Sequence, residues 1–100
     1  MKPPRRGGIW TTGAGVEVLV ISSTMYNEIP SEPTVIVVPI FDHDTDTGFG
    51  VELGETKWAA PGLVTSLRKS ALSEYRLQLD VQALTDVNNM LVKILATPDR

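Results

Sequence analysis

The chain has 100 residues, no cysteine, a formal net charge of −3 and 42% hydrophobic residues. This composition excludes a disulfide framework, a thiol nucleophile and a thiolate metal site, and the negative charge argues against broad binding of nucleic acid. Because no apolar run approaches the roughly 20 residues that span a bilayer, the sequence predicts a cytoplasmic protein of one domain without a membrane segment.

The first half of the chain is predicted to form an extended tail and three strands. Residues 1–5 contain two prolines and form the tail, and residues 6–97 form the single domain. The predicted strands cover residues 9–11, 16–22 and 34–41. The last two are β-branched and almost wholly apolar, which is typical of burial on both faces. Residues 25–33 are expected to form a loop with at most one helical turn, and Pro39 indicates a sheet edge or a bulge.

The second half is predicted to contain shorter strands. After a polar turn, residues 49–53 alternate apolar with polar or small side chains, as a half-buried strand does. A further strand is expected over residues 62–67, whereas residues 68–76 are ambiguous. Leu77 and Leu79 are assigned to a short final strand.

A helix is predicted from Asp80, which is a good N-cap, to about residue 96. Its apolar residues recur at spacings of three and four, which indicates an amphipathic helix over residues 81–96. The stripe consists of Val81, Leu84, Val87, Leu91 and Leu95, widened by Ile94. Short strands followed by one helix predict a mainly β fold: a small, strongly bent β-barrel with a C-terminal helix packed against it.

Five short segments follow one another in an order that a known family shares. They are RGGIW at 6–10, VLVIS at 18–22, VIVVPI at 35–40, a Gly-Leu-Val segment leading to Arg68, and the helix after Asp80. In this order the chain resembles the MazF/PemK toxins, which are related to the CcdB toxins. The resemblance implies an SH3-like barrel of the CcdB/MazF type and a homodimer.

The same resemblance implies a function. Active members of the family are toxins of toxin–antitoxin pairs that cut single-stranded RNA without a metal, and the disordered tail of an antitoxin blocks them. We therefore expect an endoribonuclease-family toxin that acts on single-stranded RNA, needs no cofactor and has an antitoxin protein as partner.

Three departures from the family pattern fall where its chemistry is expected. The Arg-Pro pair that precedes the VLVIS segment is replaced by Val16 and Glu17, and the Thr or Ser after the Pro-Ile pair is replaced by Phe41. Gly8 stands where the opening motif usually has an acidic residue. The family arginine stabilises charge on the scissile phosphate, and losing such a cation costs on the order of 10²–10³-fold in rate. Glu17 is expected to repel phosphate, so the sequence predicts an altered active site.

Two side chains are the candidates for the missing chemistry. Arg68 matches the arginine of a QVRT-like family segment, so the resemblance implies that it binds the phosphate; Arg5 and Arg6 are the alternatives. His43 is the only histidine, stands between two aspartates, and suits a general acid or base. Contacts to RNA or to a partner are expected from Arg6, Trp58 and Lys69. No metal site is expected.

Other interpretations of these segments remain open. Residues 42–48 form either a solvated hairpin loop or a weak calcium site, although Gly48 stands one position later than an EF-hand requires. Trp10 and Trp58 either fill the core or stack on bases. The whole chain is either an RNA-cleaving toxin or a catalytically inactive module, which acts through a protein partner as CcdB does or is a relic of the nuclease.

Overall fold

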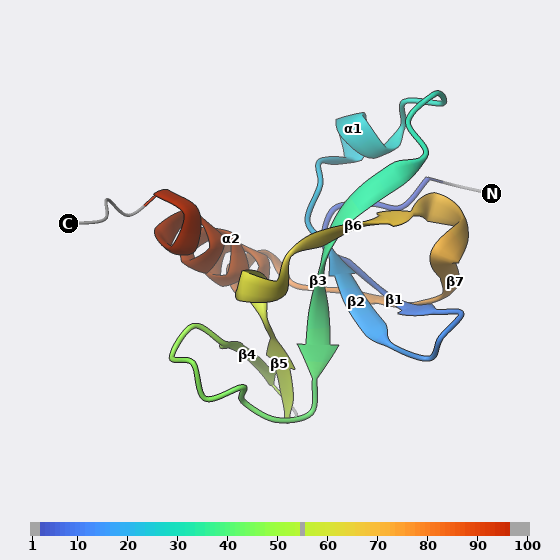
Figure 1. Ribbon diagram of the computed structural model, residues 1–100. Helices are drawn as coiled ribbons and strands as arrows, with labels where there is room; N and C mark the ends of the chain where they lie inside the picture. Colours follow the sequence, from blue (N-terminus) through green and yellow to red (C-terminus); the bar gives the residue numbers. More distant parts are fainter. Residues whose placement is uncertain (1–2, 55, 97–100) are drawn as a thin grey trace.

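The computed structural model describes residues 3–54 and 56–96, which form a strongly bent sheet and a C-terminal helix (Figure 1). The predicted mainly β fold with a C-terminal helix is therefore confirmed. The strands are β1 Gly8–Thr12, β2 Glu17–Val20, β3 Thr34–Phe41, β4 Val51–Gly54, β5 Lys57–Ala59, β6 Thr65–Arg68 and β7 Leu72–Gln78. The helices are α1 Thr24–Asn27 and α2 Val81–Ala96, with 3₁₀ turns η1 Pro61–Leu63 and η2 Lys69–Ala71. Residues 1–2 of the expected tail and residues 55 and 97 of the expected domain lie outside the described residues.

The sheet is built around β3, which pairs with three other strands. Its order is β4-β5-β3-β2-β1-β7, and β6 pairs with the first half of β3. All of these pairings are antiparallel. β4 and β7 stand at the two ends of this order and do not pair with each other, so the barrel is open on that side.

Pro39 lies inside β3, so the expectation that it marks a sheet edge is wrong. On one side Pro39 pairs with Val18 of β2. On the other side β6 pairs with β3 as far as Val37, and β5 takes over from Ile40. The carbonyl oxygen of Pro39 accepts a hydrogen bond of 3.0 Å from the backbone N–H of Ala60 in this gap. A proline is tolerated here because its missing N–H faces the junction between two partner strands.

Both faces of the central strands are buried, as their apolar sequences predict. One core, on the side of α2, consists of Ile9, Leu19, Ile21, Val38, Ile40, Val51, Ala59, Leu79 and Val87. The second core consists of Val18, Val20, Val35, Val37 and Leu72. Successive residues of β2 and β3 alternate between the two cores because side chains of a strand point to opposite faces.

The predicted helix and its cap are confirmed, but its apolar stripe is partly wrong. The backbone N–H of Ala83 donates a hydrogen bond of 2.8 Å to the Asp80 carboxylate, which caps α2. Val87 is fully buried, whereas Val81 is 80% exposed. Leu95 is also exposed, and Ala83 and Met90 pack against the core instead. The buried face is therefore rotated from the predicted one because α2 meets the sheet at an angle that its sequence alone does not fix. Within the described residues, no helix is long and apolar enough to cross a membrane.

The start of the chain is attached to the barrel by Asn27, the last residue of α1. Its side chain is fully buried, and the amide donates hydrogen bonds to the carbonyl oxygens of Pro4 and Ser22 at 2.9 and 3.1 Å. The side-chain oxygen of Asn27 accepts a hydrogen bond of 2.6 Å from the Ser22 hydroxyl. That hydroxyl oxygen in turn accepts from the backbone N–H of Ile36. One short helical turn in the predicted loop therefore joins the first residues to β3.

Candidate functional site

Val16 and Glu17, which replace the family's Arg-Pro pair, lie on opposite sides of the sheet. Val16 leads into β2 and lines a groove together with Val18, whereas Glu17 lies on the other face. Phe41 follows two residues after Pro39, which also lines the groove, so Phe41 is placed on the groove side of β3. Val16 and Phe41, which stand where the family has an arginine and a hydroxyl residue, thus share one face of the sheet.

The groove beside Val16, here called the Val16 groove, is mostly apolar and has a volume of about 620 Å³. It is lined by Thr12, Gly13, Ala14, Val16, Val18, Val37, Pro39, Leu63, Thr65, Leu67, Ser70, Ala71 and Ser73. Among these described residues there is no charged side chain. The groove therefore offers hydroxyl groups and apolar surface, but no cation that would stabilise charge developing on a phosphate.

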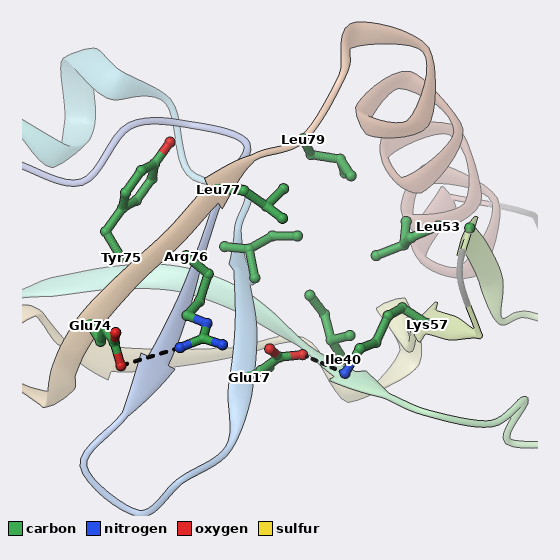
Figure 2. A pocket seen from close by; sticks show the side chains of 11 residues that line it. Glu17, Ile40, Leu53, Lys57, Glu74, Tyr75, Arg76, Leu77 and Leu79 are labelled. Carbon is green, nitrogen blue, oxygen red and sulfur yellow. Dashed lines mark ion pairs between the residues drawn. The ribbon is translucent and has the colours of Figure 1, made fainter.

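A second depression, here called the charged cleft, lies on the other face of the sheet (Figure 2). It has a volume of about 540 Å³ and lies between the edge strand β7 and the β4–β5 hairpin. Its lining consists of Ile9, Glu17, Ile40, Leu53, Gly54, Lys57, Glu74, Tyr75, Arg76, Leu77 and Leu79. The cleft thus combines an apolar floor with four charged side chains, and it occupies the opening of the barrel.

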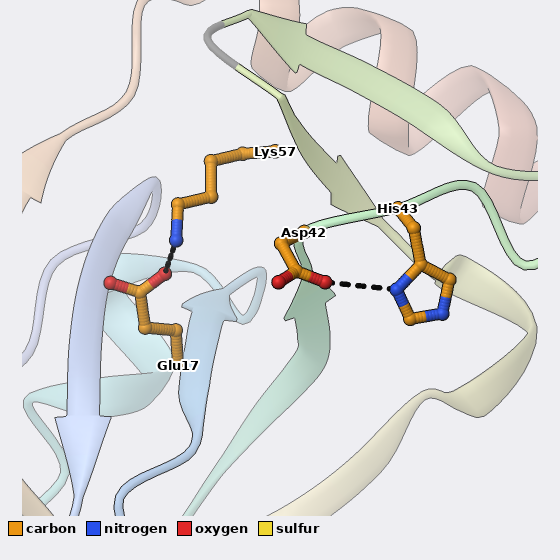
Figure 3. Close-up of polar contacts among 4 residues, drawn as sticks. All are labelled: Glu17, Asp42, His43 and Lys57. Atoms are coloured by element: carbon orange, nitrogen blue, oxygen red, sulfur yellow. Dashed lines mark hydrogen bonds and ion pairs between the residues drawn. The ribbon is translucent and has the colours of Figure 1, made fainter.

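The four charged side chains of the cleft form two ion pairs. The Lys57 ammonium lies 3.1 Å from the Glu17 carboxylate, joining β5 to β2 (Figure 3). The Arg76 guanidinium lies 3.3 Å from the Glu74 carboxylate on the same strand. Because Glu17 is paired with Lys57 and lies away from the Val16 groove, the expectation that it repels phosphate there is not supported by its position.

His43 lies in the loop after β3 and contacts its neighbour Asp42 (Figure 3). The His43 Nδ1 is 2.9 Å from an Asp42 carboxylate oxygen. The hydrogen bond from His43, together with its charge, lowers the pKa of the Asp42 carboxyl from its ordinary value of 3.8. The His43 ring also lies 5.9 Å from the ring of Phe41, measured between centroids. The side chains of Asp42 and His43 are both exposed, so this pair is accessible to a ligand.

Arg68 and Lys69 lie at the opposite end of β3. Arg68 pairs with Thr34, the first residue of β3, and its side chain is exposed. The Lys69 ammonium donates a hydrogen bond of 3.1 Å to the carbonyl oxygen of Ile29. Neither residue lines the Val16 groove or the charged cleft. These two cations therefore form a small basic surface near α1.

Trp58 and Arg6 occupy two further places. Trp58 is half-buried in β5, where it pairs with Phe41 of β3. Arg6 is exposed beside the first strand, where its carbonyl oxygen accepts a hydrogen bond from the Gln78 amide. The structure thus places His43 and Trp58 beside Phe41 at the end of β3, and it places Arg68 and Lys69 at the start of that strand.

Sequence patterns did not predict the charged cleft. Lys57 and Arg76 stand in segments with no clear pattern, and only the fold places them on two sides of one depression. An available signal was the alternation of Glu74 and Arg76, which is typical of an exposed strand edge. Within residues 3–54 and 56–96, no group of three or more acidic, histidine or cysteine side chains could hold a metal ion.

The sequence matches a family model along nearly its whole length. The model of the PemK-like, MazF-like toxins of type II toxin–antitoxin systems matches residues 5–95. The match includes every strand from β1 to β7 and α2 up to its penultimate residue. No curated protein is significantly similar to the chain in sequence.

Several solved structures share the fold. An endoribonuclease from mycobacterial species has a TM-score of 0.85 and 19% identity, covering 100% of this chain and 98% of that chain. An endoribonuclease in complex with its cognate antitoxin, also from mycobacterial species, has a TM-score of 0.83 and 19% identity over 97% and 99% of the two chains. A MazE–MazF structure from Deinococcus radiodurans has a TM-score of 0.80 and 20% identity over 95% and 98%. At these identities the likeness establishes a shared fold.

Proposed function

Because the chain belongs to the family of PemK-like, MazF-like toxins of type II toxin–antitoxin systems, we propose that it is the toxin of such a pair and cuts single-stranded RNA. It acts in the cytoplasm, and an antitoxin protein inhibits it. The family match over residues 5–95 is the observation that carries this proposal. Two similar structures support it by their descriptions, since one is an endoribonuclease and another is an endoribonuclease with its cognate antitoxin.

The chemistry of RNA cleavage requires a cation at the phosphate and a group that moves a proton. Arg68 supplies the cation, and His43 is the acid or base. Within the described residues, Arg68 has no carboxylate within ion-pair distance, so its guanidinium is available to a phosphate. Arg6, Lys69 and Trp58 are the proposed contacts to RNA or to the antitoxin.

The positions of these residues require two copies of the chain. Arg68 is paired with the first residue of β3, and His43 follows two residues after its last. Seven residue steps along a strand span about 23 Å, which is too far for both side chains to reach one phosphate. The proposed active form is therefore a homodimer in which one protomer contributes Arg68 and its partner contributes His43.

The apolar Val16 groove favours a second function, a catalytically inactive binding module. The groove occupies the face on which Val16 and Phe41 replace the family's arginine and hydroxyl residue. Without a charged side chain in its described lining, it suits an apolar segment of a protein better than an RNA phosphate. In this case the chain acts through a protein partner or is a relic of the nuclease.

An RNA cleavage assay separates the two functions. Purified protein is incubated with a long single-stranded RNA in the presence of EDTA, and the cut ends are mapped. Discrete cuts that are lost in both Arg68→Ala and His43→Ala, but retained in Arg5→Ala, support the nuclease. Mixing the two single variants should restore part of the activity if each protomer supplies one residue.

Intact RNA at high protein concentration contradicts the nuclease. The double variant Val16→Arg/Phe41→Thr then provides a sharper test, since it returns the family residues to the groove face. Cleavage by this variant, but not by the natural chain, would assign the loss of activity to the groove and support the binding module.

A further inference from the structure

We propose that Glu32 is the general base of RNA cleavage, that it acts in the same protomer as Arg68, and that His43 of the other protomer is the general acid. This inference rests on the proposed endoribonuclease function and adds the proton acceptor to it. Attack by a 2′-hydroxyl on the neighbouring phosphate needs one group that takes a proton and another that gives one. His43 fills only one of these roles in a given step, so a second titratable side chain is needed beside the phosphate.

Glu32 is held beside Arg68 through Thr34, the first residue of β3. The Thr34 hydroxyl donates a hydrogen bond of 2.8 Å to Glu32 Oε2, and the backbone N–H of Thr34 donates a second, of 3.3 Å, to the same oxygen. Thr34 and Arg68 are directly opposed in the antiparallel pairing of β3 with β6. Their side chains therefore leave the same face of the sheet about 5 Å apart. A phosphate bound by Arg68 thus lies on the side of the sheet where Glu32 is fixed.

The carboxyl of Glu32 is in the state that a base requires. Its pKa is lowered from the ordinary 4.5, chiefly by the hydrogen bond from the Thr34 hydroxyl and to a smaller extent by Tyr26 and Lys69. At neutral pH the carboxyl therefore carries no proton and can accept one. The lowered pKa makes it a weaker base, but the Lys69 ammonium that contributes to it also favours the alkoxide left when a 2′-hydroxyl loses its proton.

Lys69 fixes the loop that carries Glu32. Its backbone N–H donates a hydrogen bond of 2.8 Å to the carbonyl oxygen of Pro33, and its ammonium donates one of 3.1 Å to that of Ile29. The segment between α1 and β3 is therefore attached at two points to η2, which begins directly after Arg68. This attachment holds the base and the cation in a constant relation to each other, as positioned proton transfer requires.

The proposed step conserves atoms and protons. Glu32 takes the proton of the 2′-hydroxyl, the 2′-oxygen forms a bond to phosphorus, and the bond between phosphorus and the 5′-oxygen breaks. The 5′-oxygen takes a proton from the imidazolium of His43, so the products are a 2′,3′-cyclic phosphate and a 5′-hydroxyl end. Arg68 stabilises the negative charge that develops on the phosphate. Exchange of one proton with water returns Glu32 and His43 to their starting states.

Mixing of variants tests both the role of Glu32 and the protomer in which it acts. Glu32→Gln, which keeps the shape of the side chain, should slow cleavage at mapped sites by about 10²-fold or more. Mixing it with His43→Ala should restore part of the activity, because one of the two sites in the mixed dimer is intact. Mixing it with Arg68→Ala should restore none, because each site then lacks one residue. Glu28→Gln, a change of an exposed carboxylate at the end of α1, should leave cleavage unchanged.

A substrate with sulfur in place of the bridging 5′-oxygen separates the base from the acid. A thiolate leaves without taking up a proton, so this RNA should be cut by His43→Ala within about tenfold of the rate of the natural chain. Glu32→Gln should remain slow on it. Rescue of Glu32→Gln by the sulfur substrate would make Glu32 the acid, and restoration of activity by the mixture with Arg68→Ala would place it in the wrong protomer. Either result overturns the proposal.

Binding of an uncleavable RNA, with a 2′-deoxyribose at the cut site, shows whether Glu32→Gln remains folded. By fluorescence anisotropy it should bind at least as tightly as the natural chain. A loss of binding equal to the loss of cleavage would make Glu32 a structural residue and overturn the inference. If the natural chain cuts RNA and Glu32→Gln cuts it equally well, only this inference fails. If the natural chain cuts no RNA, the proposed function fails and the inference fails with it.

Discussion

Glu17 and Lys57 form an ion pair of 3.1 Å that connects β2 to β5 across the mouth of the charged cleft. β3 separates these two strands in the sheet, so the pair spans one intervening strand. Both side chains keep contact with water, with exposed fractions of 26% for Glu17 and 47% for Lys57. Solvent therefore screens the attraction, and the pair orients two side chains more than it stabilises the fold.

A double-mutant cycle with Glu17→Gln and Lys57→Met should give a small coupling energy for this pair. We expect about 0.5 kcal/mol in the free energy of unfolding, because partly exposed ion pairs contribute little. Urea denaturation at low and high salt measures it, and the coupling should shrink at high salt. A coupling above about 2 kcal/mol would show that the pair is far better shielded from solvent than its exposure indicates.

Asn27→Ala should destabilise the protein by about 2–3 kcal/mol. The substitution removes the buried amide and leaves the Pro4 carbonyl and the Ser22 hydroxyl without their partner, and unpaired buried polar groups are costly. Urea denaturation gives the change in the free energy of unfolding. Asn89→Ala is the matched control, since Asn89 is exposed on α2 and should change stability by less than about 0.5 kcal/mol. Similar losses for the two variants would contradict the importance of Asn27.

Val87→Ala and Val81→Ala should differ strongly although both lie on α2. Val87 is fully buried in the core, so its truncation should cost about 2–3 kcal/mol in stability through lost burial and a cavity. Val81 is 80% exposed, and its truncation should have an effect within about 0.5 kcal/mol. Thermal unfolding of both variants checks the orientation of the helix. Equal effects would mean that α2 presents a different face to the sheet.

The acidic loop provides a pH-dependent prediction. The pKa of the Asp42 carboxyl is lowered from 3.8, chiefly by its hydrogen bond with His43. A carboxyl whose pKa is lower in the folded state contributes stability above its ordinary pKa and loses it as the pH falls through the lowered value. His43→Ala should therefore raise the pKa of Asp42 toward 3.8 and remove this contribution.

Carbon-detected NMR titration of the Asp42 carboxyl measures this shift directly. The pKa of Glu32, which is lowered mainly by a hydrogen bond from the Thr34 hydroxyl, should be the same in both proteins. An Asp42 titration that does not change in His43→Ala would show that the contact of 2.9 Å is not maintained in solution.

The sequence predicted the two elements with the clearest apolar patterns, β3 and α2. The strand over Thr34–Phe41 was placed to the residue, because an unbroken β-branched run fits a central strand. The helix was also placed correctly, because Asp80 caps it and its apolar periodicity is clear. The rotation of its buried face, however, depends on how the helix packs against the sheet, and Val81 was consequently assigned to the wrong side.

The sequence left β7 ambiguous for a physical reason. Its residues after Leu72 are all exposed, and two register shifts against β1 interrupt the alternation that would reveal a strand. Arg76 lies at the first of these register shifts, between Leu77 and Tyr75. Its position in the cleft depends on that shift and could not be predicted from the sequence. Arg68 was identified by resemblance, but its distance from His43 follows only from the pairing of β6 with the start of β3.

The pairing of β1 with β7 has a consequence for the order of synthesis. β1 ends at Thr12, yet its outer neighbour β7 begins only at Leu72, so an emerging polypeptide exposes one side of its earliest strand until most of the sequence has left the ribosome. Such long-range closure makes folding slow and leaves nascent chains open to association. A truncated translation product that stops before Leu72 therefore lacks the strand that completes the sheet.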